Sequence, residues 1–231
     1  MRALTGQVQP RITAQALTFT TQRAQKAIVD QMPRVFEGGA SRYSLNSTRI
    51  EPATVQKLFA RVAVKDKTSS GTLPENYLFP SVYGGSRKEK RFERALRFDG
   101  LLKSGERAIP GDAAPLDSLG NYRLGELKKL IRELRGSKRD DGPKKTKPRK
   151  GAQLQKQGAF VGRPNKAGAQ MGVYQRYRRG KDRFVRPLLI FVTKQPRYTQ
   201  RLDFEGIARS TAQREFPEVF ARLLRKATGG N

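Results

Sequence analysis

The longest uninterrupted apolar run in the chain is short, extending only from Leu188 to Val192. A run of this length cannot cross a bilayer, so we expect no membrane-spanning segment and no membrane partner. It is typical of a buried strand. Because hydrophobic residues make up only 36% of the chain, the rest of the core has to come from amphipathic elements.

The segment after this run has the periodicity of a helix. Apolar residues recur at helical spacing from Phe204 to Leu224,. Asp203 and Glu205 lie at the start of the pattern and basic residues lie at its end, which suits the helix macrodipole. We therefore predict a strand–helix core unit, with a kink or a restart of the helix near Phe216 because Pro217 lies inside it,.

The N-terminal part of the chain predicts another helix and a pair of strands. The helical pattern stops at Gly38-Gly39, and Pro33 is expected to end or kink the helix about one turn earlier,. Residues 41–51 and 57–66 mix β-forming and polar side chains, which favours two strands,.

Two further helices are predicted in the middle of the chain. Residues 77–102 pass from an aromatic loop into a helix whose inner face holds Phe92 and Leu96,. A loop rich in Pro, Gly and Asp follows at residues 109–121. A helix at residues 122–135 then places five apolar residues on one face, namely Leu124, Leu127, Leu130, Ile131 and Leu134,.

The four helical patterns and the short strands together predict an α+β fold. Residues 136–158 contain no aromatic and no β-branched apolar side chain, so they cannot bury enough area to offset their ordering entropy,. We interpret them as a basic flexible insertion in a single domain, which residues 1–135 begin and residues 159–231 complete. Short strands or loop edges are expected at residues 159–164 and 172–180.

The composition also limits the chemistry. The chain has no cysteine and no histidine, so disulfides, the usual zinc ligand sets and Ser–His or Cys–His nucleophile pairs are excluded,. The obvious carboxylate pairs are Asp140-Asp141, in the predicted insertion, and Asp203 with Glu205, which suit helix capping. We expect no catalytic residues, no metal and no cofactor.

Charge is the strongest functional signal. The chain carries 48 Lys and Arg against 20 Asp and Glu, a net charge of +28. Residues 136–201 hold 19 Lys and Arg and three Asp, a net charge of +16. A field this positive favours polyanions or acidic protein surfaces as partners.

The densest basic run is KKTKPRKG, at residues 144–151. It has no interleaved aromatic residue for base stacking, and a solvated loop is the alternative interpretation. Its candidate contacts to a polyanion or an acidic partner are Lys144, Lys145, Lys147, Arg149 and Lys150.

A second candidate surface interleaves aromatic and basic residues in the motif YQRYRRG. This composition is typical of a protein interface or a nucleic-acid face, and a structural strand edge is the alternative. Its candidate protein-interface residues are Tyr174, Arg176, Tyr177, Arg178 and Arg179.

Several segments in a fixed order resemble one protein family. They are SVYGGSRKEKRFERALRFDGLL, AIPGDAAPLDSLGNYRLGELKKLIREL, GVYQRYRRG with RPLLIFV, and YTQRLDFEGIA with EFPEVFARLL. In this order they resemble the minor tail protein Z family of tailed bacteriophages, over roughly residues 27–225. The variable basic insertion at residues 136–158 departs from that pattern.

The resemblance implies a structural virion protein, a tail-completion or neck component at the head–tail junction. It implies a small antiparallel sheet with flanking helices and a homo-oligomeric ring. Its neighbours would be connector or portal-side proteins and tail-tube or tail-terminator proteins, after assembly in the host cytoplasm. We expect the basic stretch of residues 136–186 to meet an acidic connector surface or packaged DNA.

Two other functions are compatible with parts of the sequence. A non-enzymatic nucleic-acid-binding protein would use the basic segment, although no known binding motif is present. A magnesium-dependent enzyme acting on phosphodiesters would need paired carboxylates on ordered elements, which the sequence does not offer.

Overall fold

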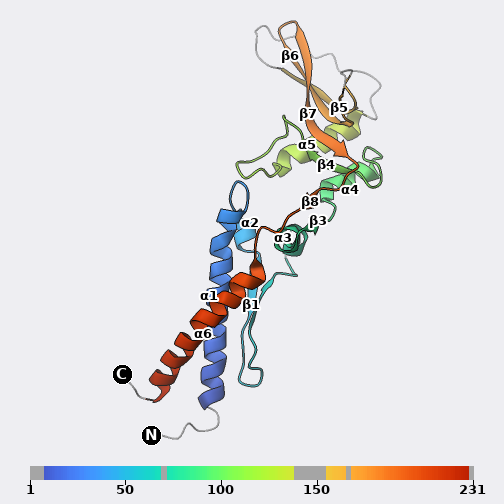
Figure 1. The fold of residues 1–231 in the computed structure, drawn as a ribbon. Helices are drawn as coiled ribbons and strands as arrows, with labels where there is room; N and C mark the ends of the chain where they lie inside the picture. The colour runs from blue at the N-terminus through green and yellow to red at the C-terminus, as the bar shows by residue number, and fades with distance from the viewer. Residues whose placement is uncertain (1–7, 69–71, 138–154, 165–167, 229–231) are drawn as a thin grey trace. The chain divides into compact units, whose positions relative to one another are not determined.

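The computed structural model describes residues 8–68, 72–137, 155–164 and 168–228. Their helices and small antiparallel sheets confirm the predicted α+β fold (Figure 1). The chain divides into two compact units. Unit 1 is made of residues 1–87 and 197–231, and unit 2 is made of residues 88–196. This division differs from the predicted one, which placed its boundaries at either end of residues 136–158.

Unit 1 joins both ends of the chain. Its two-stranded sheets pair β1 with β2 and β3 with β8, all antiparallel, and the first pair confirms the predicted strands. The elements of unit 1 are α1 (Val8–Val35), α2 (Arg42–Leu45), β1 (Thr48–Glu51), β2 (Arg61–Val64), α3 (Pro74–Tyr83), β3 (Gly85–Ser86), β8 (Arg197–Tyr198) and α6 (Phe204–Thr228).

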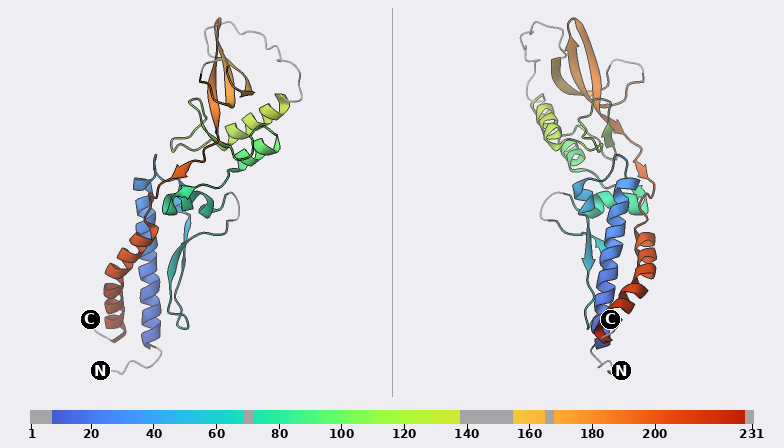
Figure 2. Two further views of the ribbon diagram at one scale, coloured as in Figure 1. Left: turned by 45° about the vertical axis from the view of Figure 1, so that its right-hand side comes forward. Right: turned by 90° about the vertical axis from the view of Figure 1, so that its left-hand side faces the viewer.

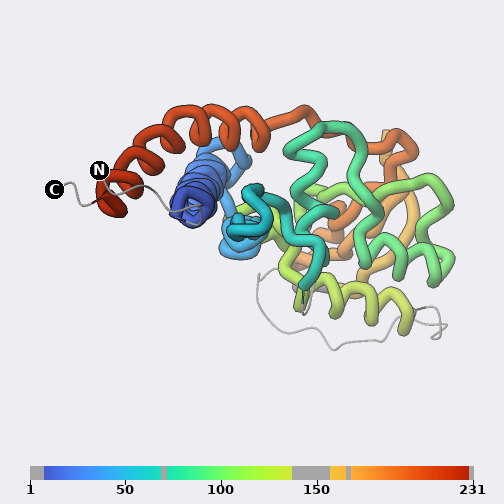
Figure 3. Tube along the Cα trace, turned by 90° about the horizontal axis from the view of Figure 1, so that it is seen from below, coloured from blue at the N-terminus to red at the C-terminus, as the bar shows by residue number. Residues whose placement is uncertain are grey.

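The core of unit 1 lies where α6 and α3 pack against α1, and Figures 2 and 3 show α6 beside α1. The buried members come from α1 and α3, from the first residue of α6 and from the segment just before α6, namely Ile28, Met32, Leu78, Val82, Phe204 and Leu202. The last helix does not restart at Pro217, which lies inside it. Likewise α1 continues past Pro33 to Val35.

The aromatic segment before Gly84 forms a helix, so the predicted loop is wrong at this point. Pro74 occupies the first turn of α3, where its missing N–H costs no intrahelical bond,. Leu78 and Val82 lie four residues apart and are both buried, which gives this short helix its inner face,. Pro80, inside the segment, obscures that periodicity in the sequence.

An arginine pair holds one carboxylate on the β1–β2 sheet. Arg61 donates to Glu51 through Nε at 2.7 Å and through Nη2 at 2.8 Å, and Arg49 donates through Nη1 at 2.5 Å. These hydrogen bonds, those from Arg61 first, lower the pKa of Glu51 from 4.5 to about 2,.

The Glu51 carboxyl is therefore expected to titrate near pH 2, measured by NMR on its side-chain carbonyl. Because the folded-state pKa is depressed, its stabilising contribution is present above about pH 4.5 and is lost as the pH falls towards 2,. Replacing Arg61 with glutamine removes the hydrogen bonds that contribute most to the lowered pKa, so the titration midpoint of Glu51 should rise. A midpoint near 4.5 in the unmodified protein would show that the pairing is absent in solution.

Over its described residues, unit 2 is a four-stranded antiparallel sheet with two helices. Its strand order is β4-β7-β6-β5. The elements are α4 (Arg91–Phe98), β4 (Arg107–Pro110), α5 (Leu124–Ser137), β5 (Gln155–Gly162), β6 (Gly172–Arg179) and β7 (Asp182–Val192). The first two residues of the predicted loop at residues 109–121 belong to strand β4. The last residues of the predicted insertion, 155–158, belong to β5, and residues 138–154 lie outside the described part of the chain.

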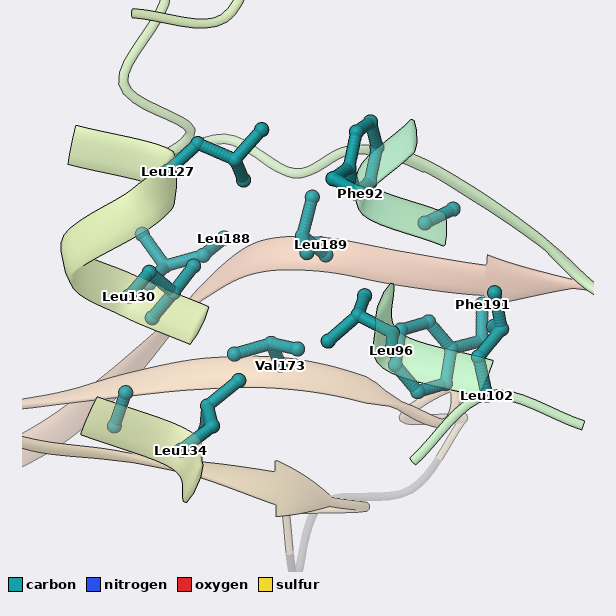
Figure 4. Packing of buried hydrophobic residues seen from close by; sticks show 12 residues of the cluster. Phe92, Leu96, Leu102, Leu127, Leu130, Leu134, Val173, Leu188, Leu189 and Phe191 are labelled. Atoms are coloured by element: carbon teal, nitrogen blue, oxygen red, sulfur yellow. The ribbon is translucent and has the colours of Figure 1, made fainter. Parts of the chain in front are cut away.

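Both helices pack on one face of the sheet (Figure 4). Alternate strand residues such as Val173, Leu189 and Phe191 point toward them, as the two-residue period of a strand requires,. Leu127, Leu130 and Leu134 of α5 are buried there, as predicted. Leu124 is 70% exposed at the first position of α5, so its predicted place in the core is wrong.

The predicted strand–helix core unit is also wrong. Strand β7 contributes Leu188, Leu189 and Phe191 to the core of unit 2, whereas Phe204 at the start of α6 belongs to the core of unit 1. The two elements are neighbours in sequence, but each finds its apolar partners in a different unit. Periodicity correctly identified both elements and could not identify their partners.

Candidate interaction surface on the β6–β7 hairpin

Strands β6 and β7 form a hairpin closed by a tight turn. Arg179 pairs with Asp182, which leaves Gly180 and Lys181 as the connection. Gly180 has a φ of 60°, the left-handed conformation that two-residue hairpin turns favour,. The hairpin extends beyond α4 and α5 in Figures 1 and 2, so its outer half stands away from the core of unit 2.

A β-bulge fixes the base of this hairpin. The register of β6 against β7 shifts between Val173 and Tyr174, opposite Pro187. Proline cannot donate to a ladder, so a bulge is where a central strand tolerates it. The segments on either side of β7 approach it so closely here that each carries a glycine. A Cβ on Gly111 would lie 2.5 Å from the Pro187 carbonyl oxygen, and a Cβ on Gly172 would lie 2.2 Å from the Leu189 carbonyl oxygen.

The register places three arginines on one face of the hairpin. Arg176 and Arg178 are two residues apart and therefore share a face, and Arg183 pairs directly with Arg178,. Arg176 and Arg183 are exposed, and Arg178 is half-buried. We call Arg176, Arg178 and Arg183 the arginine face.

Neighbouring groups orient two of these arginines. The guanidinium carbon of Arg176 lies 4.2 Å from the ring centroid of Phe160, and one of its nitrogens donates to the Gly158 carbonyl at 3.4 Å,. The Phe160 ring stacks in turn on Tyr174, with centroids 5.9 Å apart. Arg178 donates through Nε to the carbonyl of Gly180 at 2.9 Å. Each guanidinium keeps other N–H groups for a partner.

The two tyrosines of the predicted interface are buried. Tyr174 is 5% exposed and Tyr177 is 6% exposed. Tyr174 donates its hydroxyl proton to the Gln170 carbonyl at 2.8 Å, and burial raises its pKa. Tyr177 stacks on Phe184 at 5.5 Å. Tyr174 lies on the same face as Arg176 and stacks with the Phe160 ring that Arg176 covers, whereas Tyr177 lies on the opposite face,. The exposed basic side chains form the accessible surface.

The hairpin as a whole is strongly positive. Residues 172–192 hold six Lys and Arg and one Asp, a net charge of +5. Arg179 and Lys181, at the tip, and Arg186, on the opposite face from Arg176, are all exposed. Sequence analysis identified the motif up to Arg179, and the contribution of Arg183 becomes visible only through the pairing of β7 with β6.

None of these six basic side chains forms an ion pair with a carboxylate among the described residues. Arginines elsewhere commonly do, as in the pairs Arg97–Glu89, Arg135–Asp99 and Arg201–Glu37. The hairpin end of the sheet therefore carries positive charges that form no ion pair within the described part of the chain.

The other predicted polyanion contacts, Lys144, Lys145, Lys147, Arg149 and Lys150, lie outside the described residues. Asp140 and Asp141 lie outside them as well. Asp203 accepts a hydrogen bond from the Gly206 N–H at 3.0 Å, a capping contact at the start of α6,.

Within the described ranges, no cluster of three or more potential His, Cys, Asp or Glu metal ligands occurs. No helix in the part of the chain that the structure describes is both long and apolar enough to cross a membrane.

A second surface, which no pattern in the sequence indicated, lies on unit 1. The loop between β1 and β2 runs beside the N-terminal half of α1, and the Ala53 N–H donates to Thr18 Oγ1 at 3.1 Å. A groove of about 480 Å³ lies between them. Four large apolar residues on α1 and this loop are 41–50% exposed, and we call them the apolar patch: Phe19, Val55, Leu58 and Phe59.

Comparisons with known proteins give no relative: no family model, curated protein or solved structure matches the chain.

Proposed function

We propose that the chain is a structural virion protein of a tailed bacteriophage, a tail-completion or neck component. It forms a homo-oligomeric ring at the head–tail junction and helps to join the tail to the head. The order of segments that resembles the minor tail protein Z family supports this proposal. Its neighbours would be connector or portal-side proteins above and tail-tube or tail-terminator proteins below.

The apolar patch on unit 1 is the observation that most favours an assembling protein. Soluble monomers seldom leave several large apolar side chains together in solvent, and such groups mark protein interfaces. Phe19 and Val55 line the open groove, and Leu58 and Phe59, in the same loop as Val55, are 47% and 50% exposed. We assign this patch to contact with a second copy of the chain, because a ring repeats one interface in every subunit.

Self-association through the patch can be measured with two differently tagged copies expressed together. After nuclease digestion and a high-salt wash, each copy is expected to retain the other. The double variant Leu58→Gln/Phe59→Gln should lower that recovery by about tenfold or more, because both side chains lose apolar burial. Phe98→Gln, which alters a single 89% exposed ring in unit 2, is the matched control and should change little. Equal recovery for all three proteins would exclude the patch as an interface.

The virion assignment itself is tested by purification of the tagged protein from cells that propagate the phage. Portal, connector or tail proteins should remain bound after nuclease and high salt. Loss of every partner together with the nucleic acid would instead indicate the nucleic-acid-binding protein that its charge also allows.

A further inference from the structure

We propose that the arginine face of the β6–β7 hairpin binds the phosphate backbone of double-stranded DNA. This inference rests on the proposed function for its biological setting and extends it by naming the partner of this surface. The contact itself follows from the geometry of the hairpin and can be measured on the purified chain.

The first observation is an unfavourable pair of like charges. Arg178 and Arg183 lie directly opposite each other in the register, where side chains on one face are about 5 Å apart at Cβ,. Like charges in such a pair destabilise a sheet. Among the described residues no carboxylate pairs with either arginine, so a bound polyanion is the simplest source of compensation.

The second observation is that the guanidinium groups are held in place. Arg176 rests on Phe160, and Arg178 is anchored to the Gly180 carbonyl. A side chain that is already oriented loses less entropy when it binds. The planar N–H fork of arginine matches phosphate oxygens, which makes an ordered arginine row suited to a nucleic-acid backbone.

The density of phosphates favours a duplex. Strand β5 pairs with β6 as far as Gln155 opposite Arg178, so the arginine face lies on the end of a three-stranded sheet. Double-stranded DNA carries one negative charge per about 1.7 Å of its axis, twice the density of a single strand, so a fixed row of arginines meets more phosphates on a duplex. The arginine face would then lie along the phosphate backbone.

The same face is poorly suited to two other partners. Single strands are bound by stacking of bases on open aromatic rings. Here Arg176 covers Phe160, and Tyr174 is buried. Protein interfaces combine arginines with aromatic anchors, and the described side chains of this face expose the arginines alone.

The experiment is fluorescence anisotropy with a labelled 30-base-pair duplex and the full-length chain, between 50 and 200 mM NaCl. The test variant is Arg176→Gln/Arg178→Gln/Arg183→Gln. The matched control is Arg209→Gln/Arg222→Gln/Arg225→Gln, which removes the same charge from exposed positions of α6 that make no ion pair with the described residues. Far-UV circular dichroism checks that each variant keeps its secondary structure.

The test variant should bind DNA about tenfold more weakly or worse at 100 mM salt. Its slope of log K against log[salt] should be less steep than that of the unmodified chain by about 2.7, since each lost phosphate contact contributes about 0.9. Replacing the three arginines with lysine should keep most of that slope, because the charges remain. The α6 variant should stay close to the unmodified chain.

Three outcomes would overturn the inference. Equal losses for the two glutamine variants would show a general effect of net charge. No loss for the test variant would show that the duplex binds elsewhere. Unchanged DNA binding with lost binding to poly-glutamate would assign the face to acidic proteins. Because self-association is measured separately through Leu58 and Phe59, failure here leaves the proposed ring intact, and failure of the ring leaves DNA binding measurable.

Discussion

Replacing Glu93 with alanine is expected to lower the free energy of unfolding of unit 2 by about 2–5 kcal/mol. Glu93 is fully buried although it is a charged residue. Its Oε2 accepts the Lys90 N–H at 2.7 Å and so caps the start of α4,. Its Oε1 accepts the Ala108 N–H of β4 at 2.9 Å. One carboxylate thus links a helix to an edge strand, and alanine would leave both donors without this acceptor.

Hydrogen–deuterium exchange on the full chain would measure this effect within unit 2. Peptides from α4 and β4 should lose protection in Glu93→Ala, while peptides from α1 serve as the internal control. Glu218→Ala, an exposed position of α6, is the matched control and should stay within about 0.5 kcal/mol of the unmodified chain,. Unchanged protection at Ala108 in the Glu93 variant would mean that the buried link does not stabilise unit 2.

The variant Gly172→Ala should destabilise the hairpin by about 1–3 kcal/mol. A Cβ at this position would lie 2.2 Å from the backbone oxygen of Leu189, and a backbone atom cannot move aside as a flexible side chain can. The two strands would have to separate next to the bulge that positions the arginine face. DNA binding should therefore weaken as well, although residue 172 itself carries no charge.

The same substitution at Gly125 provides a control of opposite sign. Gly125 lies in α5, and a Cβ there would meet no atom within 4 Å. Alanine is a better helix former than glycine, so Gly125→Ala should be neutral or stabilising by up to about 1 kcal/mol. Thermal unfolding followed by circular dichroism compares the two variants. Equal midpoints would show that the close approach at Gly172 is relieved without cost.

Periodicity predicted most helices because their apolar residues are both regular and buried, as with Leu127, Leu130 and Leu134. It failed for α3, where Pro80 interrupts a short pattern, and for β4, which has only four residues beside a Pro- and Gly-rich loop. The two-unit division was also hidden, because it depends on which elements pack together across long stretches of sequence.

The candidate surface was only partly visible in the sequence for a similar reason. The motif YQRYRRG contains Arg176 and Arg178, but strand register is needed to add Arg183, and neighbouring strands and rings are needed to bury both tyrosines. The buried role of Glu93 was hidden as well, because a charged residue within a helical pattern is normally assigned to solvent. Sequence patterns thus locate elements and motifs, and cross-strand pairing determines which side chains act together.

The most direct measurement of the proposed function is the copy number of this chain in purified phage particles, by quantitative mass spectrometry against the portal protein. A neck component should be present at a fixed number of copies per particle, and its density should form a ring at the head–tail junction in electron micrographs. Absence of the chain from complete particles, with unchanged particle assembly when its gene is deleted, would contradict a structural role in the virion.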